Sequence, residues 1–154
     1  AASIGNSGSF SADGALLDVA VDQNNLGNQT AALLTVQNMV AEATSTAASI
    51  GNSLSVEMPG GSKITATQNN AGTMIADLTG TIASTVDYTA TAAAIGNSYA
   101  LTSLDSGIAG NVSSSLNQWN GAGQIAKVTA NIAASTNAAA TAAAIGNSVS
   151  INVK

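Results

Sequence analysis

The sequence predicts an all-β fold: a β-solenoid of strand–turn–strand rungs, stacked as three and a half repeats of 45–50 residues. First, the string Ile-Gly-Asn-Ser occurs four times, and successive copies are 46, 45 and 50 residues apart. Second, the residues after each copy alternate between apolar and polar, which is the period of a strand. Third, asparagine, serine, threonine and glycine fill the repeat, and these residues disfavour helix interiors. We therefore expect a single repeat domain over residues 1–154, with repeats at about 1–46, 47–92 and 93–142 and a partial repeat at 143–154.

The first half of each repeat is predicted to be a strand that runs through the Ile-Gly-Asn-Ser string. Counted from the isoleucine, the fourth and sixth following positions are mostly apolar, and the fifth and seventh are mostly small or polar. Alternate side chains of a strand point to opposite sides of a sheet. We therefore expect two core columns, formed by Ile4, Ile50, Ile95 and Ile145 and by Phe10, Val56, Leu101 and Ile151.

An exposed turn of variable length is predicted to follow this strand. Glycine, proline and aspartate favour turns, and they gather in the half of the repeat whose length varies. The turn signals are Asp13-Gly14, Pro59-Gly60-Gly61 and Asp105-Ser106-Gly107.

The second half of each repeat begins at a glutamine, and its length is fixed. Gln23, Gln68 and Gln118 each lie 27 residues before the next isoleucine of the string. Such fixed spacing predicts a stretch whose register is set by stacking. Because the two markers divide the repeat near its middle, we favour two rungs of about 23 residues per repeat over one wide rung.

Stacked repeats would place identical side chains in columns along the axis. Amide side chains in such columns can hydrogen-bond from rung to rung, although turn residues are the alternative interpretation of these amides. The predicted stacking ladders are Asn6, Asn52, Asn97 and Asn147; Gln23, Gln68 and Gln118; and Asn25, Asn70 and Asn120.

The composition excludes several classes of function. With a net charge of −5, three lysines and no arginine, the chain lacks the basic surface that nucleic acid requires. Without histidine or cysteine it has no parts for a serine–histidine relay, a thiol nucleophile or a histidine–cysteine metal site. We expect no enzyme activity and no cofactor. No apolar run approaches the roughly 20 residues that span a bilayer, so no membrane span is expected.

Two further binding interpretations concern the strand surface. Glu42 and Asp87 share a column, where a solvated face is the expectation and calcium the alternative. Threonine pairs precede the string around Thr44 and Thr89 and thin to Thr141. These arrays resemble those of ice-binding proteins, and ordinary β-branched strand surface is the alternative.

The Asn-, Gln-, Ser-, Gly- and Ala-rich strand–turn–strand repeats resemble bacterial curlin-type fibre subunits, including the curlin-like surface-anchoring filaments of holdfast-forming bacteria. Ser62 and Gln68 match the curlin spacing of serine, five residues and glutamine, and Gln23 followed by Asn28 matches the next step. The resemblance implies secretion in soluble form and head-to-tail polymerisation into an extracellular cross-β fibre. A weaker similarity, in the Ala-Ile-Gly strings, is to the head repeats of trimeric autotransporter adhesins.

The predicted function is a structural subunit of a secreted, extracellular or cell-surface filament, which polymerises head-to-tail by strand stacking of its terminal repeats. The open ends of a solenoid are rows of unpaired backbone groups, and polar caps normally cover them. The expected partners are other copies of the chain and a secretion or anchoring partner at the cell surface. The alternative function is a monomeric β-solenoid binding module, with an adhesin or ice-binding face. The expected junction residues are Ala2, Ile4, Phe10, Ile145, Val149, Ile151 and Val153.

Overall fold

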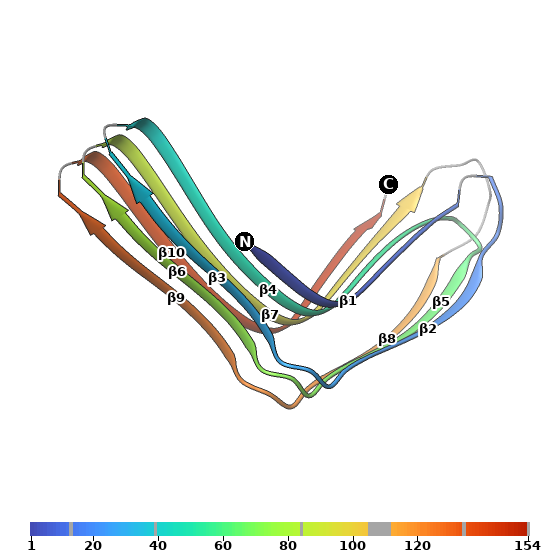
Figure 1. Cartoon of the computed structure of the whole chain (residues 1–154). Helices are drawn as coiled ribbons and strands as arrows, with labels where there is room; N and C mark the ends of the chain where they lie inside the picture. Colours follow the sequence, from blue (N-terminus) through green and yellow to red (C-terminus); the bar gives the residue numbers. More distant parts are fainter. Residues whose placement is uncertain (13, 39, 84, 105–111, 134, 154) are drawn as a thin grey trace.

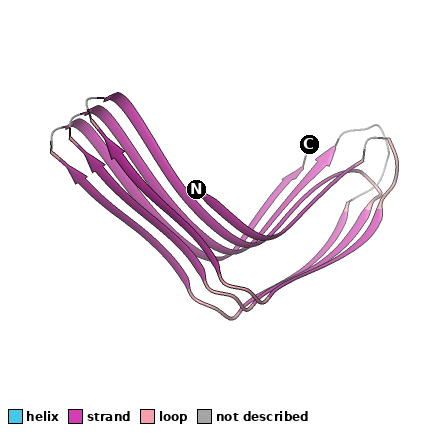
Figure 2. Cartoon of the chain, in the orientation of Figure 1, coloured by secondary structure: helices cyan, strands magenta, loops and turns pink. Residues whose placement is uncertain are grey.

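The computed structural model describes residues 1–12, 14–38, 40–83, 85–104, 112–133 and 135–153, and every regular element in these ranges is a β-strand (Figure 2). The predicted all-β class is confirmed. The strands are β1 (Ala2–Ser11), β2 (Asp18–Asn25), β3 (Gln29–Gln37), β4 (Val40–Pro59), β5 (Lys63–Asn70), β6 (Met74–Ile82), β7 (Thr85–Leu104), β8 (Ser113–Asn120), β9 (Gln124–Ile132) and β10 (Ser135–Val153).

The strands form three parallel sheets, which we call sheet A (β1-β4-β7-β10), sheet B (β2-β5-β8) and sheet C (β3-β6-β9). Each pairing joins equivalent positions of successive repeats, such as Ile4 with Ile50 and Gln23 with Gln68. The chain passes from sheet A to B, to C and back to A one strand further along. This path is that of a β-solenoid, as predicted.

The expected division of each repeat into two rungs is wrong, because one whole repeat makes one wide rung. The two halves of a repeat do not stack on each other. Each half instead folds back on itself: in the first half the end of β4 packs against β5, and in the second half β6 packs against the start of β7. The next rung therefore begins only after the full repeat, and Asn25 pairs with Asn70 rather than with a residue of its own repeat.

The molecule is V-shaped, because the long strands of sheet A bend near their middle (Figure 1). Sheet A lines the inner side of the V, with sheet B outside one arm and sheet C outside the other. Each arm has its own core. The arm of sheet B buries Leu54, Val56, Met58, Ile64, Ala66, Tyr99 and Leu101. The arm of sheet C buries Ala43, Ala47, Met74, Ala76, Leu78, Ile82, Tyr88, Ala90, Ala92 and Ala94.

The bend lies at the glycine of the Ile-Gly-Asn-Ser string. Before Gly51 the buried side chains of β4 are at positions 43, 45, 47 and 49, and after it they are at 52, 54, 56 and 58 and at the last residue, 59. The alternation therefore shifts by one residue at the bend. A Cβ atom on Gly51 would lie 2.5 Å from the carbonyl oxygen of Gly96 and 2.6 Å from Asn70 Oδ1, so a larger residue does not fit there.

This shift overturns the prediction that the isoleucines form a core column. Ile4 is 48% exposed and Ile145 38% exposed, whereas Ile50 and Ile95 are half-buried. None of the four belongs to either buried core cluster. An uninterrupted strand would place Ile50 and Val56 on one side of the sheet, but the irregular step at Gly51 separates them.

The second core column faces the interior of the sheet B arm. Its inner members, Val56 and Leu101, are buried. Its outer members, Phe10 and Ile151, are exposed because β1 and β10 are the edge strands of sheet A.

The turns use glycine where the sequence predicted it. Gly14 and Gly61 have φ angles of 73° and 79°, a left-handed conformation that glycine adopts without steric cost. The predicted turn at Asp105-Ser106-Gly107, like Asp13, lies outside the described residues.

Candidate functional site

A first ladder of asparagine side chains crosses all four strands of sheet A at the bend. Asn6 Nδ2 donates to Asn52 Oδ1, Asn52 Nδ2 to Asn97 Oδ1, and Asn97 Nδ2 to Asn147 Oδ1, each at 2.8 Å. Each inner amide also donates to a sheet B carbonyl oxygen, that of Asn69 for Asn52 and that of Trp119 for Asn97. The ladder therefore ties the sheets together across the interior as well as along the stack.

A glutamine ladder runs along sheet B in the opposite direction. Gln118 Nε2 donates to Gln68 Oε1 at 2.7 Å, and Gln68 Nε2 donates to Gln23 Oε1 at 2.8 Å. The same nitrogens donate to carbonyl oxygens of sheet A, so Gln68 bonds to the carbonyl of Ser98 at 2.9 Å. Gln68 is fully buried, and these bonds satisfy its amide.

A third ladder closes the outer corner of the bend. Asn25 Nδ2 donates to Asn70 Oδ1, and Asn70 Nδ2 donates to Asn120 Oδ1, both at 2.7 Å. At the end of this ladder Asn120 Nδ2 donates to Gln124 Oε1 at 2.9 Å. The predicted amide columns thus lie in three hydrogen-bonded rows between the two apolar cores.

The three ladders are directional, and the direction leaves complementary groups at the two edges of the stack. Among the described residues, no donor reaches Asn6 Oδ1 or Asn25 Oδ1 at the edge formed by β1, β2 and β3. At the opposite edge, Asn147 Nδ2 makes only a 3.3 Å bond to the carbonyl of Gln118, and Gln118 Oε1 accepts no bond within the described part of the chain. One edge therefore offers asparagine acceptors, and the other offers an asparagine donor.

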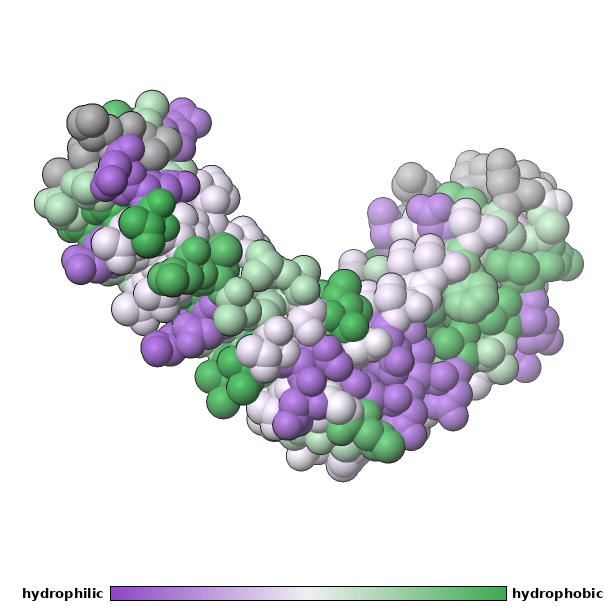
Figure 3. Space-filling view, in the orientation of Figure 1, coloured by the Kyte–Doolittle hydropathy of each residue, from purple (hydrophilic) through white to green (hydrophobic). Residues whose placement is uncertain are grey.

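Exposed large apolar side chains concentrate in the two outer rungs. Figure 3 shows apolar atoms interleaved with hydrophilic ones along both arms. The first rung exposes Ile4, Phe10, Leu16, Leu26, Leu34 and Val36, and the last exposes Trp119, Ile125, Ile145, Val149 and Ile151. Among the described residues of the rung between them, Val86 is the large apolar side chain that is exposed. The outer rungs thus carry exposed apolar side chains in addition to the hydrogen-bonding groups at their edges.

The predicted junction residues lie on opposite edges of the stack. Ala2, Ile4 and Phe10 are on β1, while Ile145, Val149 and Ile151 are on β10. Two strands, β4 and β7, separate these two edges, so one chain does not bring them together. The backbone of Val153 pairs with Ser103, and its side chain lies outside the described residues.

Sequence reasoning missed three features of the edges. A hollow of about 560 Å³ opens at the first edge beside Gly8, Phe10, Val21 and Gln23. It forms where Gly8 stands in the column that holds Leu54 and Tyr99 further along. Leu26 is 71% exposed, and Trp119 is 54% exposed with its ring against Gly121. The signal for the hollow was the glycine in an otherwise apolar column.

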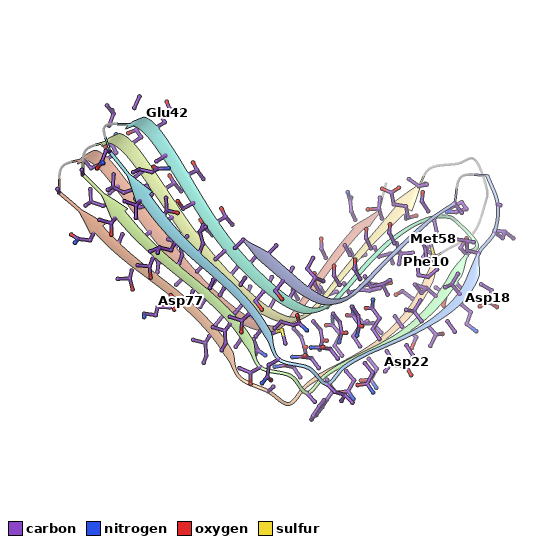
Figure 4. The ribbon with its side chains drawn as sticks, viewed as in Figure 1. Phe10, Asp18, Asp22, Glu42, Met58 and Asp77 are labelled. Atoms are coloured by element: carbon purple, nitrogen blue, oxygen red, sulfur yellow. The ribbon has the colours of Figure 1, made fainter. Side chains whose placement is uncertain are left out.

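The threonine columns and the acidic residues of the described ranges face away from the cores. Thr44 pairs with Thr89, and Thr46 pairs with Thr91, on the open side of sheet A. Asp18 and Asp22 project from the outer side of sheet B, Asp77 lies on the outer side of sheet C, and Glu42 lies at the far end of its arm (Figure 4).

A shallow hollow of about 480 Å³ lies beside Glu42, Asp87 and Asn137, and Asn137 Nδ2 donates to Asp87 Oδ1 at 2.7 Å. Across the described ranges, no three acidic, histidine or cysteine side chains come together as a metal site.

The comparisons with known proteins give one result. The family model HfaD, described as holdfast attachment protein D, matches residues 1–154. No curated protein and no solved structure matches the chain. In the part of the chain that the structure describes, no helix is long and apolar enough to cross a membrane.

Proposed function

Because the chain belongs to the holdfast attachment protein D family, and so has an adhesion-related role at the cell surface, we propose that it is the structural subunit of an extracellular filament. In this proposal the subunits extend the filament by stacking the edge rung of one copy on the opposite edge rung of the next. The role is structural and not catalytic. A secretion or anchoring partner holds the filament at the cell surface.

The observation that carries the proposal is the polarity of the amide ladders. If two copies met through the same edge, Asn6 Oδ1 of one copy would face a hydrogen-bond acceptor of the other copy, and no hydrogen bond could form. Two copies that meet head-to-tail instead bring the Asn147 amide of one copy to an asparagine acceptor of the next. The glutamine ladder supports the same head-to-tail arrangement. Gln23 Nε2 can donate to Gln118 Oε1 of the preceding copy, in the same direction as the glutamine bonds within the chain.

Apolar surface favours the same contact. The outer rungs expose large apolar side chains, and burial of apolar surface contributes about 25 cal/mol per Å². Stacking would bury Phe10, Val149 and Ile151, because their columns are buried in the inner rung at Val56, Tyr99 and Leu101. The curlin-type assembly that the sequence resembles has the same head-to-tail character, which supports the proposal.

Electron microscopy tests the proposal directly. The purified 154-residue chain is diluted out of denaturant and imaged over several hours. We expect uniform unbranched filaments whose fibre diffraction has a reflection near 4.7–4.8 Å along the axis. Stable monodisperse particles at all concentrations would overturn the proposal and favour the monomeric binding module, with the threonine columns as its candidate face.

A further inference from the structure

The open side of sheet A carries an isoleucine at the bend in every repeat. Ile50 and Ile95, on the two inner strands, pair with each other, are half-buried and belong to neither buried core cluster. An alanine lies beside each of them on one arm, and a serine lies beside each on the other. Together these side chains form the bottom of the concave side of the V (Figures 1 and 3). We call this strip the groove, and on β4 and β7 it consists of Ala48, Ile50, Ser53, Ala93, Ile95 and Ser98.

The outer vertex of the V, where sheet B passes into sheet C, is the convex counterpart of the groove (Figure 2). The residue that follows the third ladder in each repeat is Leu26, Ala71 or Gly121, and all three are exposed. The exposed ring of Trp119 lies against Gly121. Because Ala71 belongs to the inner rung, the exposure of this column does not depend on the edges of the stack. We call Leu26, Ala71, Trp119 and Gly121 the corner.

The groove and the corner are both uncharged. No charged residue occurs in residues 46–55 of β4 or 91–100 of β7, on either side of the bend. None occurs in residues 23–31, 68–76 or 118–126, which lead into and out of the corner. Contact between the two surfaces would therefore remove no charge from water, and the burial of apolar side chains would favour it.

We propose that copies of the chain nest laterally, with the corner of one copy inserted into the groove of the next. The partner is thus a second copy of this chain, which approaches from the side of the stack and not along its axis. Because the groove and the corner lie on opposite sides of the molecule, each added copy leaves its own groove free, and nesting continues in an open row. This inference goes beyond the proposed filament and does not require it, since a single chain carries both surfaces.

The area available for nesting is that of a stable interface. β4 and β7 are each 20 residues long. At about 3.3 Å per residue and a strand spacing of about 4.8 Å, each long strand of sheet A offers a face of roughly 320 Å². Three such strands offer roughly 950 Å², and a standard interface buries about 800 Å² per partner. Nested arms therefore provide enough surface for a specific contact.

The charges on the sheet C arm are complementary across this contact. The shallow hollow beside Glu42 and Asp87 is acidic and lies on the open side of this arm, whereas Lys127 is exposed on its outer side. Nesting places the outer side of one copy against the open side of the next. Because the inserted V sits inside the receiving one, its arm is shifted toward the tip, and Lys127 moves toward the acidic hollow. Asp77 neighbours Lys127 in its own sheet, so the lysine lies between carboxylates of both copies.

Crosslinking between the two surfaces tests nesting. Ser55 is exposed on the open side of sheet A beside the groove, and Ala71 is part of the corner. The chain has no cysteine, so the variant S55C/A71C carries one thiol next to each surface. The purified variant is treated with a short bismaleimide and resolved by denaturing gel electrophoresis. The single variants S55C and A71C are the controls, because nesting brings unlike surfaces together.

We expect a ladder of covalent multimers from S55C/A71C and dimers at most from either single variant. Head-to-tail stacking does not produce this ladder, since in a stack Ser55 and Ala71 stay on opposite sides. A double variant that stays monomeric on the gel would overturn nesting. Dimers from the single variants in the same yield as the multimers would also overturn it.

A second measurement tests the isoleucines of the groove. The double substitution I50T/I95T removes apolar surface and keeps a β-branched side chain in each strand. In the S55C/A71C background it should lower the multimer yield by about tenfold or more, with an unchanged circular dichroism spectrum. Val36, exposed at the end of β3 outside both surfaces, supplies the control V36T, which should keep the yield within about twofold. An unchanged yield from folded I50T/I95T would overturn the proposal.

Electron microscopy separates the outcome from that of the proposed function. Nested filaments should lie side by side as ribbons, in parallel with the S55C/A71C ladder. Single filaments without a ladder would overturn nesting while supporting the proposed filament. A ladder from chains that form no filaments would support nesting and overturn the proposed function.

Discussion

Asn52 Nδ2 lies 2.8 Å from Asn97 Oδ1, and both side chains are completely buried between the two cores of the molecule. In an apolar interior an unpaired amide is costly, whereas a row of amides that satisfy one another stabilises one particular register. A shift by one residue would replace asparagine by glycine or serine in this row. The Asn52–Asn97 bond thus fixes the register that every other column follows.

Replacing Asn52 with alanine should lower the free energy of unfolding by about 3 kcal/mol, because the truncation leaves buried partners unsatisfied. The orphaned groups would be Asn6 Nδ2, Asn97 Oδ1 and the carbonyl of Asn69. Guanidinium denaturation of freshly diluted monomer measures the change. Ser55→Ala, at an exposed position on the same strand, is the matched control and should stay within about 0.5 kcal/mol of wild type. Equal stability of the two variants would contradict a stabilising ladder.

Gly51→Ala should prevent normal folding or destabilise the chain by at least about 2 kcal/mol, because the new methyl group meets the carbonyl of Gly96 and Oδ1 of Asn70. Gly123→Ala is the control, since a Cβ atom there meets nothing within 4 Å. Thermal unfolding followed by circular dichroism compares the two. A Gly51→Ala protein that melted like Gly123→Ala would show that the bend tolerates a side chain.

The sequence predicts much of this architecture, because its repeats identify the positions that are structurally equivalent. The columns of Asn52, Gln68 and Asn70 follow from spacing alone, and the stacking of successive repeats follows from the columns. Spacing cannot show what bends a strand. The close approach at Gly51 involves Asn70 and Gly96, which are distant in sequence, and it reverses the side on which Ile50 lies. Likewise, whether the two halves of a repeat stack on each other or form the two arms of one rung depends on packing between sheets.

Alanine on the core-facing side of sheet A sets how closely that sheet approaches sheet C. Ala92 is fully buried beside larger side chains of sheet C, whereas Ala93 points to the open side. Ala92→Leu should therefore destabilise the chain by about 1–3 kcal/mol through overpacking, and Ala93→Leu should be tolerated. Denaturant unfolding of both variants is the measurement. Equal losses would mean that leucine harms the strand by its propensity and not by its volume.

Asn147→Asp should slow filament elongation at least tenfold, because it replaces the amide donor at the growing edge with a carboxylate that faces another acceptor. An unmade buried hydrogen bond to a charged group costs about 1.5–3 kcal/mol, and 1.4 kcal/mol corresponds to a factor of ten. Seeded growth, with wild-type seeds and variant monomer, gives the rate. Asn131→Asp adds the same charge on the exposed face of β9 and should leave the rate within about twofold. If both variants slow growth equally, net charge and not the ladder controls elongation.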